Sequence, residues 1–374
     1  MLRYELIKAT VGGGRRGRLS TPHGTVETPA FMPVGTYGTV RGLTPAQLAE
    51  AGVTMLLCNA YHLALRPGAE TIKRLGGLHR FMGWRGPILT DSGGYQLFSL
   101  ADRVKIDERG AVFRSHLDGA EYQLTPERAV DVQCQLGVDV GMVFDVLVGE
   151  PGDRHTAADA AARTVRWAER SRRYASETGE TSFFAIMQGG LFDDLRAENA
   201  SALVDLDFPG YAVGGLSVGE ERGETMRTAE FAVRLLPETK PRYMMGMGTP
   251  TDLVRLSGWG YDLFDCVIPT RNGRNGTVFT RGGEISIRNA VNALDEGPIE
   301  AACDCYTCRT FSRAYMHHLA KRGEMLAATL ASLHNVRFYQ RLMEDIRAAL
   351  AADEYDHFAA DFLHGYGRDQ NELG

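Results

Sequence analysis

The sequence predicts an α/β protein that folds as a closed (β/α)8 (TIM) barrel. Eight apolar, strand-like runs recur along the chain, and amphipathic helical stretches separate most of them. Alternation of strands and helices indicates a parallel sheet with helices outside it, and eight repeats favour closure into a barrel. An open doubly wound sheet would favour a Gly-rich phosphate turn after the first strand, and Val34-Gly35-Thr36-Tyr37-Gly38 does not match that pattern.

The predicted elements follow one another in a regular order. The strand-like runs are residues 29–34, 54–59, 87–90, 138–144, 182–187, 211–216, 242–247 and 263–268. The helical stretches are residues 44–51, 69–75, 125–136, 156–177, 192–204, 224–236 and 250–256. Thr44-Pro45, Thr125-Pro126 and Thr249-Pro250 each place a capping hydroxyl before a proline at the first helical position. Asp252 adds a first-turn acid that suits the helix dipole.

Three segments depart from this alternation. Residues 12–16, Gly-Gly-Gly-Arg-Arg, predict a turn between two N-terminal antiparallel strands. After the third barrel strand, residues 104–106, 111–114 and 121–123 predict a small β-hairpin insertion. The last apolar run breaks at Pro269, and we expect a loop there that carries Arg271 and Arg274. We otherwise expect one barrel domain over residues 1–374.

Composition excludes several classes of protein. Apolar content of 44% and charged content of 24% are typical of a soluble globular protein. No apolar run approaches the roughly 20 residues that a membrane span requires, and the N-terminus shows no apolar signal region, so we expect a cytoplasmic protein. The net charge of −6 argues against a sequence-blind nucleic-acid binder, although it permits a local basic groove.

Polar residues gather at the predicted strand ends, where a barrel carries its chemistry. Asp91, Ser92 and Tyr95 follow the third run, Asp145 follows the fourth, and Gln188 follows the fifth. Gly215, Leu216 and Met245 lie at the ends of the sixth and seventh runs, and Asp265 lies in the eighth. Glycines at such ends let a flat ligand approach the backbone closely.

Two carboxylates across one pocket permit a double displacement. We assign this pair to Asp265 and Asp91: one attacks an acetal-like carbon, and the other protonates the leaving group and later takes a proton from the incoming one. Asp145 and Gln188 can bind a polar planar base, and the backbone of Gly215-Leu216 can add an amide edge.

Tyr95 and Met245 can hold an aromatic ring between them, through stacking and sulfur contact. No His-x-His motif follows the first strand, which disfavours a binuclear metal hydrolase.

A cysteine cluster near the C-terminus predicts a structural zinc site. Cys303, Cys305 and Cys308 supply three thiolates within six positions, which in a reducing compartment indicates metal rather than disulfide. Tetrahedral zinc needs a fourth ligand, and the candidates are His317, His318 and His334. His334 lies in a strong helical pattern, but spacing alone leaves the choice among the three histidines open.

Arg271 and Arg274 lie just past the candidate nucleophile, next to Asn272 and Asn275. A local basic strip beside the barrel mouth suits a phosphate backbone. The alternative, ordinary surface charge, is the better interpretation for Lys321 and Arg322.

With these residues in place, the chain resembles the bacterial tRNA-guanine transglycosylases (queuine tRNA-ribosyltransferases) over nearly its whole length. The resemblance is carried by residues 91–96 (Asp-Ser-Gly-Gly-Tyr-Gln), 187–190 (Met-Gln-Gly-Gly), 214–220 (Gly-Gly-Leu-Ser-Val-Gly-Glu), 243–248 (Tyr-Met-Met-Gly-Met-Gly), 265–276 (Asp-Cys-Val-Ile-Pro-Thr-Arg-Asn-Gly-Arg-Asn-Gly), and the three cysteines with His334.

The resemblance implies a fold, an activity and a set of roles. It implies a barrel with an inserted zinc-binding subdomain, within about residues 296–345. It implies an enzyme that exchanges guanine at the wobble position (34) of tRNAs with GUN anticodons for a 7-deazaguanine, through a covalent ribosyl-enzyme intermediate. Asp265 would be the nucleophile on C1′ of the ribose, and Asp91 the general acid/base.

Binding roles follow from the same resemblance. The base would contact Asp91, Ser92, Tyr95, Asp145, Gln188, Gly215, Leu216 and Met245. The RNA would contact Gly246, Met247, Gly248, Thr249, Pro250, Thr251, Asp252, Thr270, Arg271, Asn272, Gly273 and Arg274. One structural Zn²⁺ per subunit would be held by Cys303, Cys305, Cys308 and His334, and the enzyme would be a homodimer that binds one tRNA.

One departure concerns the incoming base. Bacterial members usually follow the recognition aspartate with Glu and Cys, whereas Val146 and Leu147 follow Asp145 here. The aminomethyl base preQ1 is the expected substrate, and Val218 favours this smaller base. Queuine or another deazaguanine is the alternative. A non-catalytic tRNA-binding subunit and a carbohydrate glycosidase are further alternatives, and retention of both Asp91 and Asp265 argues against the first of them.

Overall fold

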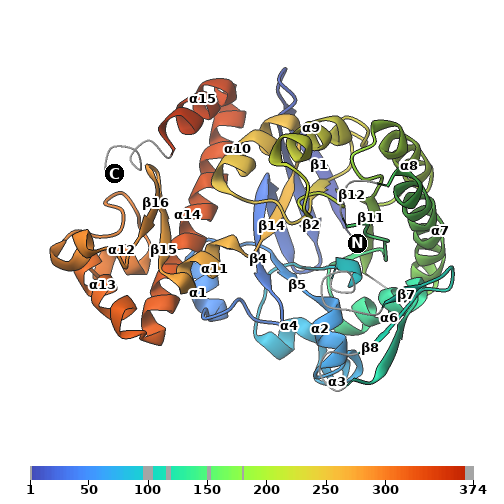
Figure 1. Ribbon diagram of the computed structural model, residues 1–374, viewed down its shortest axis with the longest axis horizontal. Helices are drawn as coiled ribbons and strands as arrows, with labels where there is room; N and C mark the ends of the chain where they lie inside the picture. The colour runs from blue at the N-terminus through green and yellow to red at the C-terminus, as the bar shows by residue number, and fades with distance from the viewer. Residues whose placement is uncertain (1, 96–103, 115–118, 150–152, 179–180, 367–374) are drawn as a thin grey trace.

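The computed structural model describes residues 2–95, 104–114, 119–149, 153–178 and 181–366. Eight parallel strands form a closed barrel in the order β10-β11-β12-β13-β14-β4-β5-β6, which confirms the predicted fold class (Figure 1). The strands are β4 (Ala30–Gly35), β5 (Leu56–Cys58), β6 (Ile88–Thr90), β10 (Val140–Met142), β11 (Ser182–Met187), β12 (Tyr211–Val213), β13 (Arg242–Met244) and β14 (Leu263–Cys266).

The barrel closes because its last strand pairs with its first. β14 pairs in parallel with β4, so that Asp265 lies opposite Met32. Every residue of β5, β6, β10, β12, β13 and β14 is buried. Such continuous apolar runs are expected where helices cover the outer face and side chains fill the inner one.

Helices surround the barrel, and all three predicted Thr-Pro starts are confirmed. Thr44, Thr125 and Thr249 cap α1 (Pro45–Glu50), α6 (Pro126–Leu136) and α10 (Pro250–Trp259), and each side chain accepts a hydrogen bond from the N–H three residues later. The other helices up to β13 are α2 (Ala60–Leu65), α3 (Ala69–Arg74), α4 (Gly77–Met82), α7 (Arg154–Thr178), α8 (Asp193–Asp205) and α9 (Arg222–Val233).

An antiparallel sheet covers the amino-terminal end of the barrel. It consists of β1 (Arg3–Ala9), β2 (Arg15–Thr21) and β3 (Gly24–Thr28), with the predicted Gly-rich turn between β1 and β2. Asp262, the residue before β14, is fully buried and accepts hydrogen bonds from Arg15 (3.1 Å), Tyr4 (2.8 Å) and the N–H of Arg242 (2.8 Å). This buried carboxylate joins the N-terminal sheet to the barrel strands.

The insertion after β6 contains one strand more than the predicted hairpin. β7 (Lys105–Ile106), β8 (Ala111–Arg114) and β9 (Glu121–Leu124) form a three-stranded antiparallel sheet. All three strands coincide with the predicted runs to within one residue. The difference is that all three pair in one sheet, whereas a hairpin pairs only two.

The segment after Asp265 differs from the prediction. The strand ends at Cys266, and residues 268–275 form helix α11 (Ile268–Asn275) instead of continuing the strand and then a loop. Pro269 lies in the first turn of α11, where its missing N–H costs no hydrogen bond. The predicted loop carrying Arg271 and Arg274 was therefore wrong, because Pro269 lies at the start of a helix and not in a loop.

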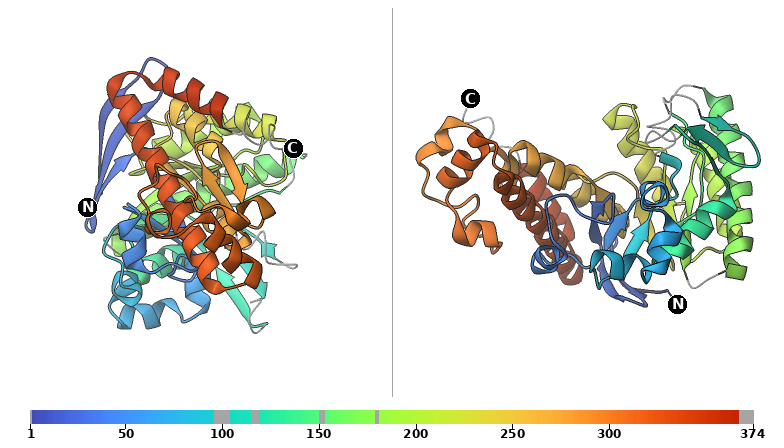
Figure 2. Two further views of the ribbon diagram at one scale, coloured as in Figure 1. Left: turned by 90° about the vertical axis from the view of Figure 1, so that its left-hand side faces the viewer. Right: turned by 90° about the horizontal axis from the view of Figure 1, so that it is seen from below.

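The C-terminal part lies beside the barrel (Figures 1 and 2). It comprises β15 (Thr277–Thr280), β16 (Gly283–Ser286), the 3-10 helix η1 (Ala290–Leu294), α12 (Tyr306–Thr310), α13 (Arg313–Arg322), α14 (Met325–Ala352) and α15 (Tyr355–Gly365). Its own apolar cluster draws on residues from Val278 to Ala331, including the three cysteines. The long helix α14 connects this cluster with the barrel, since Leu342 and Ile346 belong to the barrel core. In the described part of the chain, we find no helix with the length and apolar character of a membrane span.

Candidate active site

A cavity of about 620 Å³ opens at the carboxyl-terminal mouth of the barrel. Asp91, Asp145, Gln188 and Asp265, which the sequence placed at four different strand ends, all line it. The two predicted catalytic carboxylates therefore face one space, as parallel strands that end at the same mouth require.

Asp265 is buried among hydrogen-bond donors at the floor of the cavity. Its Oδ1 accepts from the hydroxyl of Tyr243 (2.6 Å) and from the N–H of Gly246 (2.8 Å). Burial raises the pKa of Asp265, and the two hydrogen bonds oppose that rise. The described residues place no donor on Oδ2, so this oxygen is the one available to attack a carbon in the cavity.

Asp91 lies on a different side of the same space. Its Oδ2 accepts a hydrogen bond from the side-chain amide of Asn59, and its Oδ1 accepts from the N–H of Ala60 (2.9 Å). The charge of Asp91 and that of Asp265 both raise the pKa of the buried Tyr243 hydroxyl, after the larger effect of its burial. The field of both carboxylates thus reaches one group at the cavity floor.

Asp145 and Gln188 form a hydrogen-bonded wall. Asp145 accepts from the Ser92 hydroxyl at Oδ1 (2.9 Å) and from the Gln188 amide at Oδ2 (2.7 Å). Burial raises the pKa of Asp145, and these two hydrogen bonds oppose the rise. In turn, the backbone N–H of Gln188 donates to Asn199 on α8 (3.0 Å). The wall presents carboxylate and amide groups in fixed orientations, which suits a planar polar ligand.

The Gly214-Gly215 segment brings backbone against this wall. Gly215 has φ +66°, and an added Cβ there would lie 2.3 Å from Oε1 of Gln188. Beyond Leu216, the N–H groups of Ser217 and Val218 donate to the Glu220 carboxylate. Glycine is required at Gly215, because a side chain would displace Gln188.

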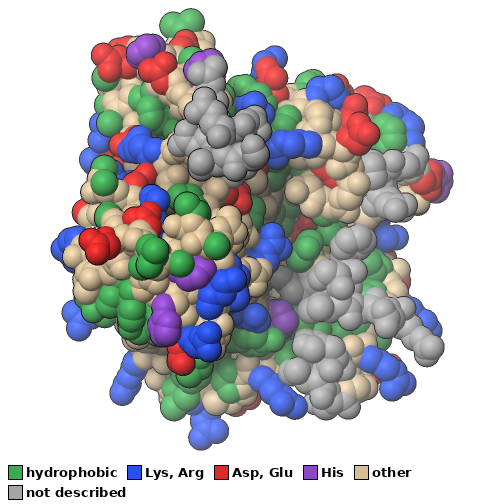
Figure 3. All heavy atoms as spheres, turned by 60° about the vertical axis from the view of Figure 1, so that its left-hand side comes forward, with side chains coloured by type: hydrophobic (Ala, Val, Ile, Leu, Met, Phe, Trp, Pro, Cys, Tyr) green, Lys and Arg blue, Asp and Glu red, His purple; other side chains and the backbone are tan. Residues whose placement is uncertain are grey.

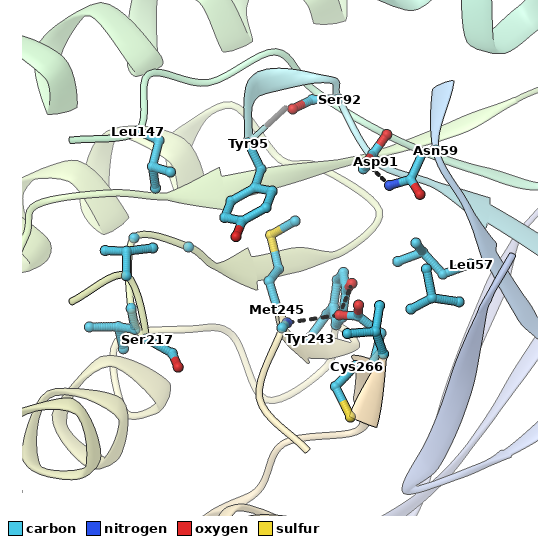
Figure 4. A pocket seen from close by; sticks show the side chains of 18 of the residues that line it. Leu57, Asn59, Asp91, Ser92, Tyr95, Leu147, Ser217, Tyr243, Met245 and Cys266 are labelled. Carbon is cyan, nitrogen blue, oxygen red and sulfur yellow. Dashed lines mark hydrogen bonds between the residues drawn. The ribbon is translucent and has the colours of Figure 1, made fainter. Parts of the chain in front are cut away.

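Tyr95 and Met245 point toward one another across the cavity (Figure 4). Tyr95 is 57% exposed, which leaves its ring available to a ligand. Leu147 and Ser217 lie on one side of this pair, and Asn59 and Asp91 lie on the other (Figure 4). The space between the four groups is bounded above and below by apolar side chains and at its edges by polar ones.

Helix α11 places two arginines beside the cavity. Arg271 lines it and is exposed, and Arg274 lies one turn further on the same helix. Burial lowers the pKa of Arg274, and the nearby charges of Arg41 and Arg271 lower it further. Within the described ranges none of these three arginines pairs with a carboxylate. Lys and Arg side chains border a hollow on this face (Figure 3). Uncompensated cations of this kind attract an anionic ligand such as phosphate.

The other residues that the resemblance implies for RNA contact differ in exposure. Gly246 is exposed and lines the cavity, but its N–H belongs to Asp265. Asp252 is buried and accepts hydrogen bonds from Thr249 and Arg222, which serves the start of α10. Buried members are Met247, Gly248, Pro250, Asp252, Thr270 and Gly273; partly buried members are Thr249, Thr251, Asn272 and Arg274. RNA contact by the buried members stays a prediction.

Cys303, Cys305, Cys308 and His334 converge on one point. Their ligand atoms lie within 4.8 Å of one another, and Nδ1 of His334 lies 3.7, 3.7 and 3.2 Å from the three Sγ atoms. Tetrahedral zinc, with Zn–S near 2.3 Å and Zn–N near 2.0 Å, sets S···N separations of about 3.5 Å. Nε2 of His334 lies 2.7 Å from the carbonyl oxygen of Phe279, which fixes the ring with Nδ1 toward the sulfurs.

The geometry singles out His334 among the three histidines that spacing left open. His317 instead lies with Nδ1 2.9 Å from the carbonyl oxygen of Ile287, and the cluster of possible metal ligands includes neither His317 nor His318.

Comparison with known proteins agrees with this geometry. A family model described as queuine tRNA-ribosyltransferase matches residues 10–368 of the chain. The chain belongs to this family.

Relatives of the same name resemble the chain along its length. A queuine tRNA-ribosyltransferase of Hydrogenovibrio crunogenus is 48% identical over 98% of this chain and 99% of its own. Those of Desulfosudis oleivorans and Pelotomaculum thermopropionicum are each 52% identical, over 93% and 96% of this chain and 91% and 96% of their own. The predicted family and the predicted enzyme class, a pentosyltransferase, are confirmed. The queuine tRNA-ribosyltransferase family acts on tRNA and a base.

Sequence reasoning missed several residues of this family member's site. Asn59, which holds Asp91, is the last residue of the predicted run 54–59, so the strand-end rule that found Asp145 applied equally to it. Tyr243 carries no such signal, since it lies inside an apolar strand and only the barrel's curvature turns its hydroxyl toward Asp265. Arg196 and Asn199 were missed because they lie on α8 and contact the strand ends from behind.

Proposed function

We propose that this enzyme exchanges guanine at the wobble position (34) of tRNAs with GUN anticodons for a 7-deazaguanine, by double displacement. The observation that carries the proposal is the pair Asp91 and Asp265, which come from separate strand ends and line one cavity. A pair of carboxylates around one sugar carbon can break and remake a glycosidic bond with retention.

In the first step, Oδ2 of Asp265 attacks C1′ of the ribose. The bond between C1′ and the guanine nitrogen breaks, an ester between ribose and Asp265 forms, and Asp91 delivers a proton to the departing base. Tyr243 and Gly246 hold the other oxygen of Asp265, so the attacking oxygen points into the cavity. Orienting the nucleophile before attack lowers the entropic part of the activation barrier.

In the second step, the incoming base takes the place of guanine. Its ring nitrogen gives up a proton to Asp91 and attacks C1′, and the ester bond breaks to release the Asp265 carboxylate. Between the steps the tRNA stays covalently attached, so no group outside the protein is needed to retain it.

Recognition of the base would rest on the wall and the stacking pair. Asp145, Gln188 and the Gly215-Leu216 backbone would bind the edge of the purine, while Tyr95 and Met245 would cover its faces. The target nucleotide must leave the anticodon-loop stack to reach this depth, which a single-stranded loop permits. Arg271 and Arg274 would contact the RNA beside it.

Trapping of the intermediate tests the proposal. Asp265→Asn should abolish the covalent RNA adduct on a denaturing gel and the incorporation of radiolabelled guanine into cognate tRNA, because an amide does not attack C1′. Wild-type protein that exchanges no guanine would leave a non-catalytic tRNA-binding subunit as the function. An RNA-shifted band retained by Asp265→Asn would remove that residue from the nucleophile's role.

The choice of incoming base would depend on Leu147. This side chain lies at one side of the cavity near Ser217 (Figure 4) and adds bulk where a substituent of the base would extend. We propose preQ1, the smaller base, as the substrate. Titration of the enzyme with preQ1 and with queuine distinguishes the two, and tighter binding of queuine would overturn the choice.

We also propose that the Cys3His cluster binds one structural Zn²⁺ per subunit. All four positions of a tetrahedral ion would be filled by protein, which leaves none for a substrate. Cys305→Ser should lower zinc content below one per chain and destabilise the C-terminal part, because structural zinc contributes folding energy directly. Metal analysis checks this, and a full equivalent of zinc in the variant would contradict it.

The enzyme would act as a homodimer in the cytoplasm. Apolar side chains are exposed on the C-terminal part: Tyr306, Tyr315, Met325 and Leu326. Phe311 lies between the two tyrosines, stacked on Tyr315 and edge-on to Tyr306. A second copy of the chain would cover them. Light scattering should give a dimer for the wild type and a smaller species for Tyr315→Glu.

A further inference from the structure

Helix α8 buries an arginine directly behind the base-recognition wall. Arg196 is fully buried; its Nε donates to the carbonyl of Gly190 (2.7 Å) and its Nη2 donates to the carbonyl of Gly214 (3.1 Å). These carbonyls belong to the turns that follow β11 and β12, the strands that supply Gln188 and Gly215. One guanidinium therefore bridges the turn beside Gln188 and the turn beside Gly215.

The contact with Gly214 fixes the direction of the next N–H group. The peptide bond between Gly214 and Gly215 is trans, and in a trans peptide the C=O and N–H groups point in opposite directions. Because the Gly214 carbonyl points back to Arg196, the Gly215 N–H points away from it, toward the cavity that both glycines line. Within the described residues the Gly215 N–H donates to no protein acceptor.

The same helix also holds the backbone of Gln188. Asn199, one turn after Arg196, accepts a hydrogen bond from the N–H of Gln188 (3.0 Å) and donates to the carbonyl of Ala161 on α7 (2.8 Å). An added Cβ at Gly189 would lie 2.8 Å from the backbone nitrogen of Arg196, so the turn after β11 packs tightly on α8. Gln188 and Gly215 thus share one rigid support.

The charge of Arg196 has no ion-pair partner to satisfy. No carboxylate lies within ion-pair distance of it in the described part of the chain, and its Nη1 is buried without a protein acceptor. Burial lowers its pKa to about 10, which leaves it protonated at neutral pH. A buried cation without a counter-ion is costly. A hydrogen bond from a charged donor also polarises the Gly214-Gly215 peptide, which makes its N–H a stronger donor.

We propose that Arg196 is a positioning residue for base recognition: through the Gly214 carbonyl it presents the Gly215 N–H to the carbonyl oxygen of the purine. It touches no substrate itself. The proposal rests on the proposed function, since it assumes that a guanine-like base occupies the cavity. Guanine exchange by the wild type tests that function separately, before any change at Arg196 is made.

The test compares two bases in two proteins. Arg196→Lys keeps the charge but reaches one carbonyl at most. We expect it to bind guanine about tenfold more weakly than the wild type does, as loss of one good hydrogen bond predicts. 2-Aminopurine lacks the carbonyl oxygen, so its affinity should change less than threefold. In exchange assays the KM for guanine should rise about tenfold, while kcat and the KM for tRNA stay within about twofold.

Controls separate positioning from loss of folding. Arg227→Lys makes the same change on neighbouring helix α9, where the arginine pairs with Asp193. It should alter the affinity for neither guanine nor 2-aminopurine. Arg196→Gln keeps a hydrogen-bond donor without the charge. It should fold, and it should weaken guanine binding more than Arg196→Lys does. Equal losses for guanine and 2-aminopurine, or no loss for either, would overturn the proposal, as would a fall in kcat with an unchanged KM for guanine.

Discussion

At the scale of single residues, the two carboxylates that we propose as catalytic occupy different surroundings. Asp265 is held by a phenol and a backbone N–H, whereas Asp91 is held by an amide side chain and a backbone N–H. A phenol at 2.6 Å from a buried carboxylate is a strong, short donor. Tyr243 is therefore the residue that tunes the proposed nucleophile.

Removal of this phenol should change both rate and pH dependence. The Tyr243 hydrogen bond opposes the rise in the pKa of Asp265 that burial causes, so Tyr243→Phe raises that pKa further. Less Asp265 is then ionised at low pH, and the acid limb of the kcat/KM profile for guanine exchange moves to higher pH. We expect kcat at neutral pH to fall about tenfold.

Tyr261→Phe is the matched control for that measurement. Its buried hydroxyl donates to the carbonyl of Ala229 outside the cavity (2.8 Å), so the variant loses a comparable hydrogen bond and should leave the acid limb in place. An unchanged limb in Tyr243→Phe would show that this phenol does not tune Asp265.

Residue chemistry at strand ends could be predicted, but its supports could not. Asp145 and Gln188 stand out in the sequence because polar side chains at the ends of apolar runs must have a use or a partner. Tyr243 and Arg196 lie in apolar or helical surroundings, where the chain gives no sign of which partner they meet. Those partners are distant in sequence, and only the closed barrel brings them together.

At the scale of elements, helix α11 explains how the arginines are presented. Arg271 and Arg274 are three residues apart, which places them on one face of a helix. Thr270 and Gly273 lie on the buried face, where an added Cβ at Gly273 would meet Ser332 of α14 at 2.7–2.8 Å. Gly273, which suggested a loop, is thus required for close helix packing, and sequence patterns alone do not reveal this.

Gly273→Ala should separate α11 from α14. The methyl group would push against the backbone of Ser332, so we expect a loss of about 1–3 kcal/mol in the free energy of unfolding. Binding of tRNA should weaken, because Arg271 and Arg274 move with the helix, while guanine binding should persist. Urea unfolding and RNA titration measure these effects.

Gly223→Ala on α9 serves as the control, since an added Cβ there meets nothing within 4 Å. It should leave tRNA binding intact and stabilise the protein by up to about 1 kcal/mol. Equal effects of the two substitutions would refute the packing explanation.

At the scale of the whole molecule, the two ends of the barrel have separate tasks. The carboxyl-terminal end carries the cavity, and the amino-terminal end is covered by the sheet β1-β2-β3. Two buried carboxylates hold that cover, Asp262 and Asp139. Asp139, just before β10, accepts hydrogen bonds from His23 in the β2–β3 turn (2.9 Å), from His79 on α4 (3.2 Å) and from the N–H of Ile88 (2.9 Å).

The rings of His23 and His79 stack 3.6 Å apart at 15°. Each ring directs a nitrogen at a different oxygen of Asp139. That arrangement fits two hydrogen bonds better than one shared metal ion, because the ring planes are nearly parallel and do not meet at a point between them.

The alternation of strands and helices predicts the barrel, but this cover lies outside that pattern. The turn at residues 12–14 indicates the first two strands, yet nothing in the sequence links His23 to Asp139, 116 positions away. A buried carboxylate before a strand is equally compatible with a simple turn. The sequence therefore predicts the strands and helices of the barrel, but not the contacts that cover its amino-terminal end.

The stability contributed by Asp139 should depend on pH in a defined window. Burial alone would raise its pKa, but hydrogen bonds from His79, Ile88 and His23 lower it to about 2 from an ordinary 3.8. A lowered carboxylate pKa stabilises the fold at pH values above the unfolded pKa, and that contribution disappears as pH falls from about 4 to about 2. A difference of this size corresponds to about 2 kcal/mol. Asp139→Asn should therefore lower the free energy of unfolding by about 2 kcal/mol at pH 7.

Urea unfolding of Asp139→Asn and of the wild type at pH 7, 5, 4 and 3 measures this contribution. The difference in the free energy of unfolding between the two proteins should narrow at pH 4 and pH 3. Asp205→Asn is the control, because this exposed aspartate at the end of α8 forms no ion pair with the described residues; its stability should change little at any pH. Guanine exchange by Asp139→Asn below its melting temperature should match the wild type, because the cavity lies at the other end of the barrel. A gap that stays constant from pH 7 to pH 3 would mean that the shape of the Asp139 side chain, rather than its charge, holds the cover in place.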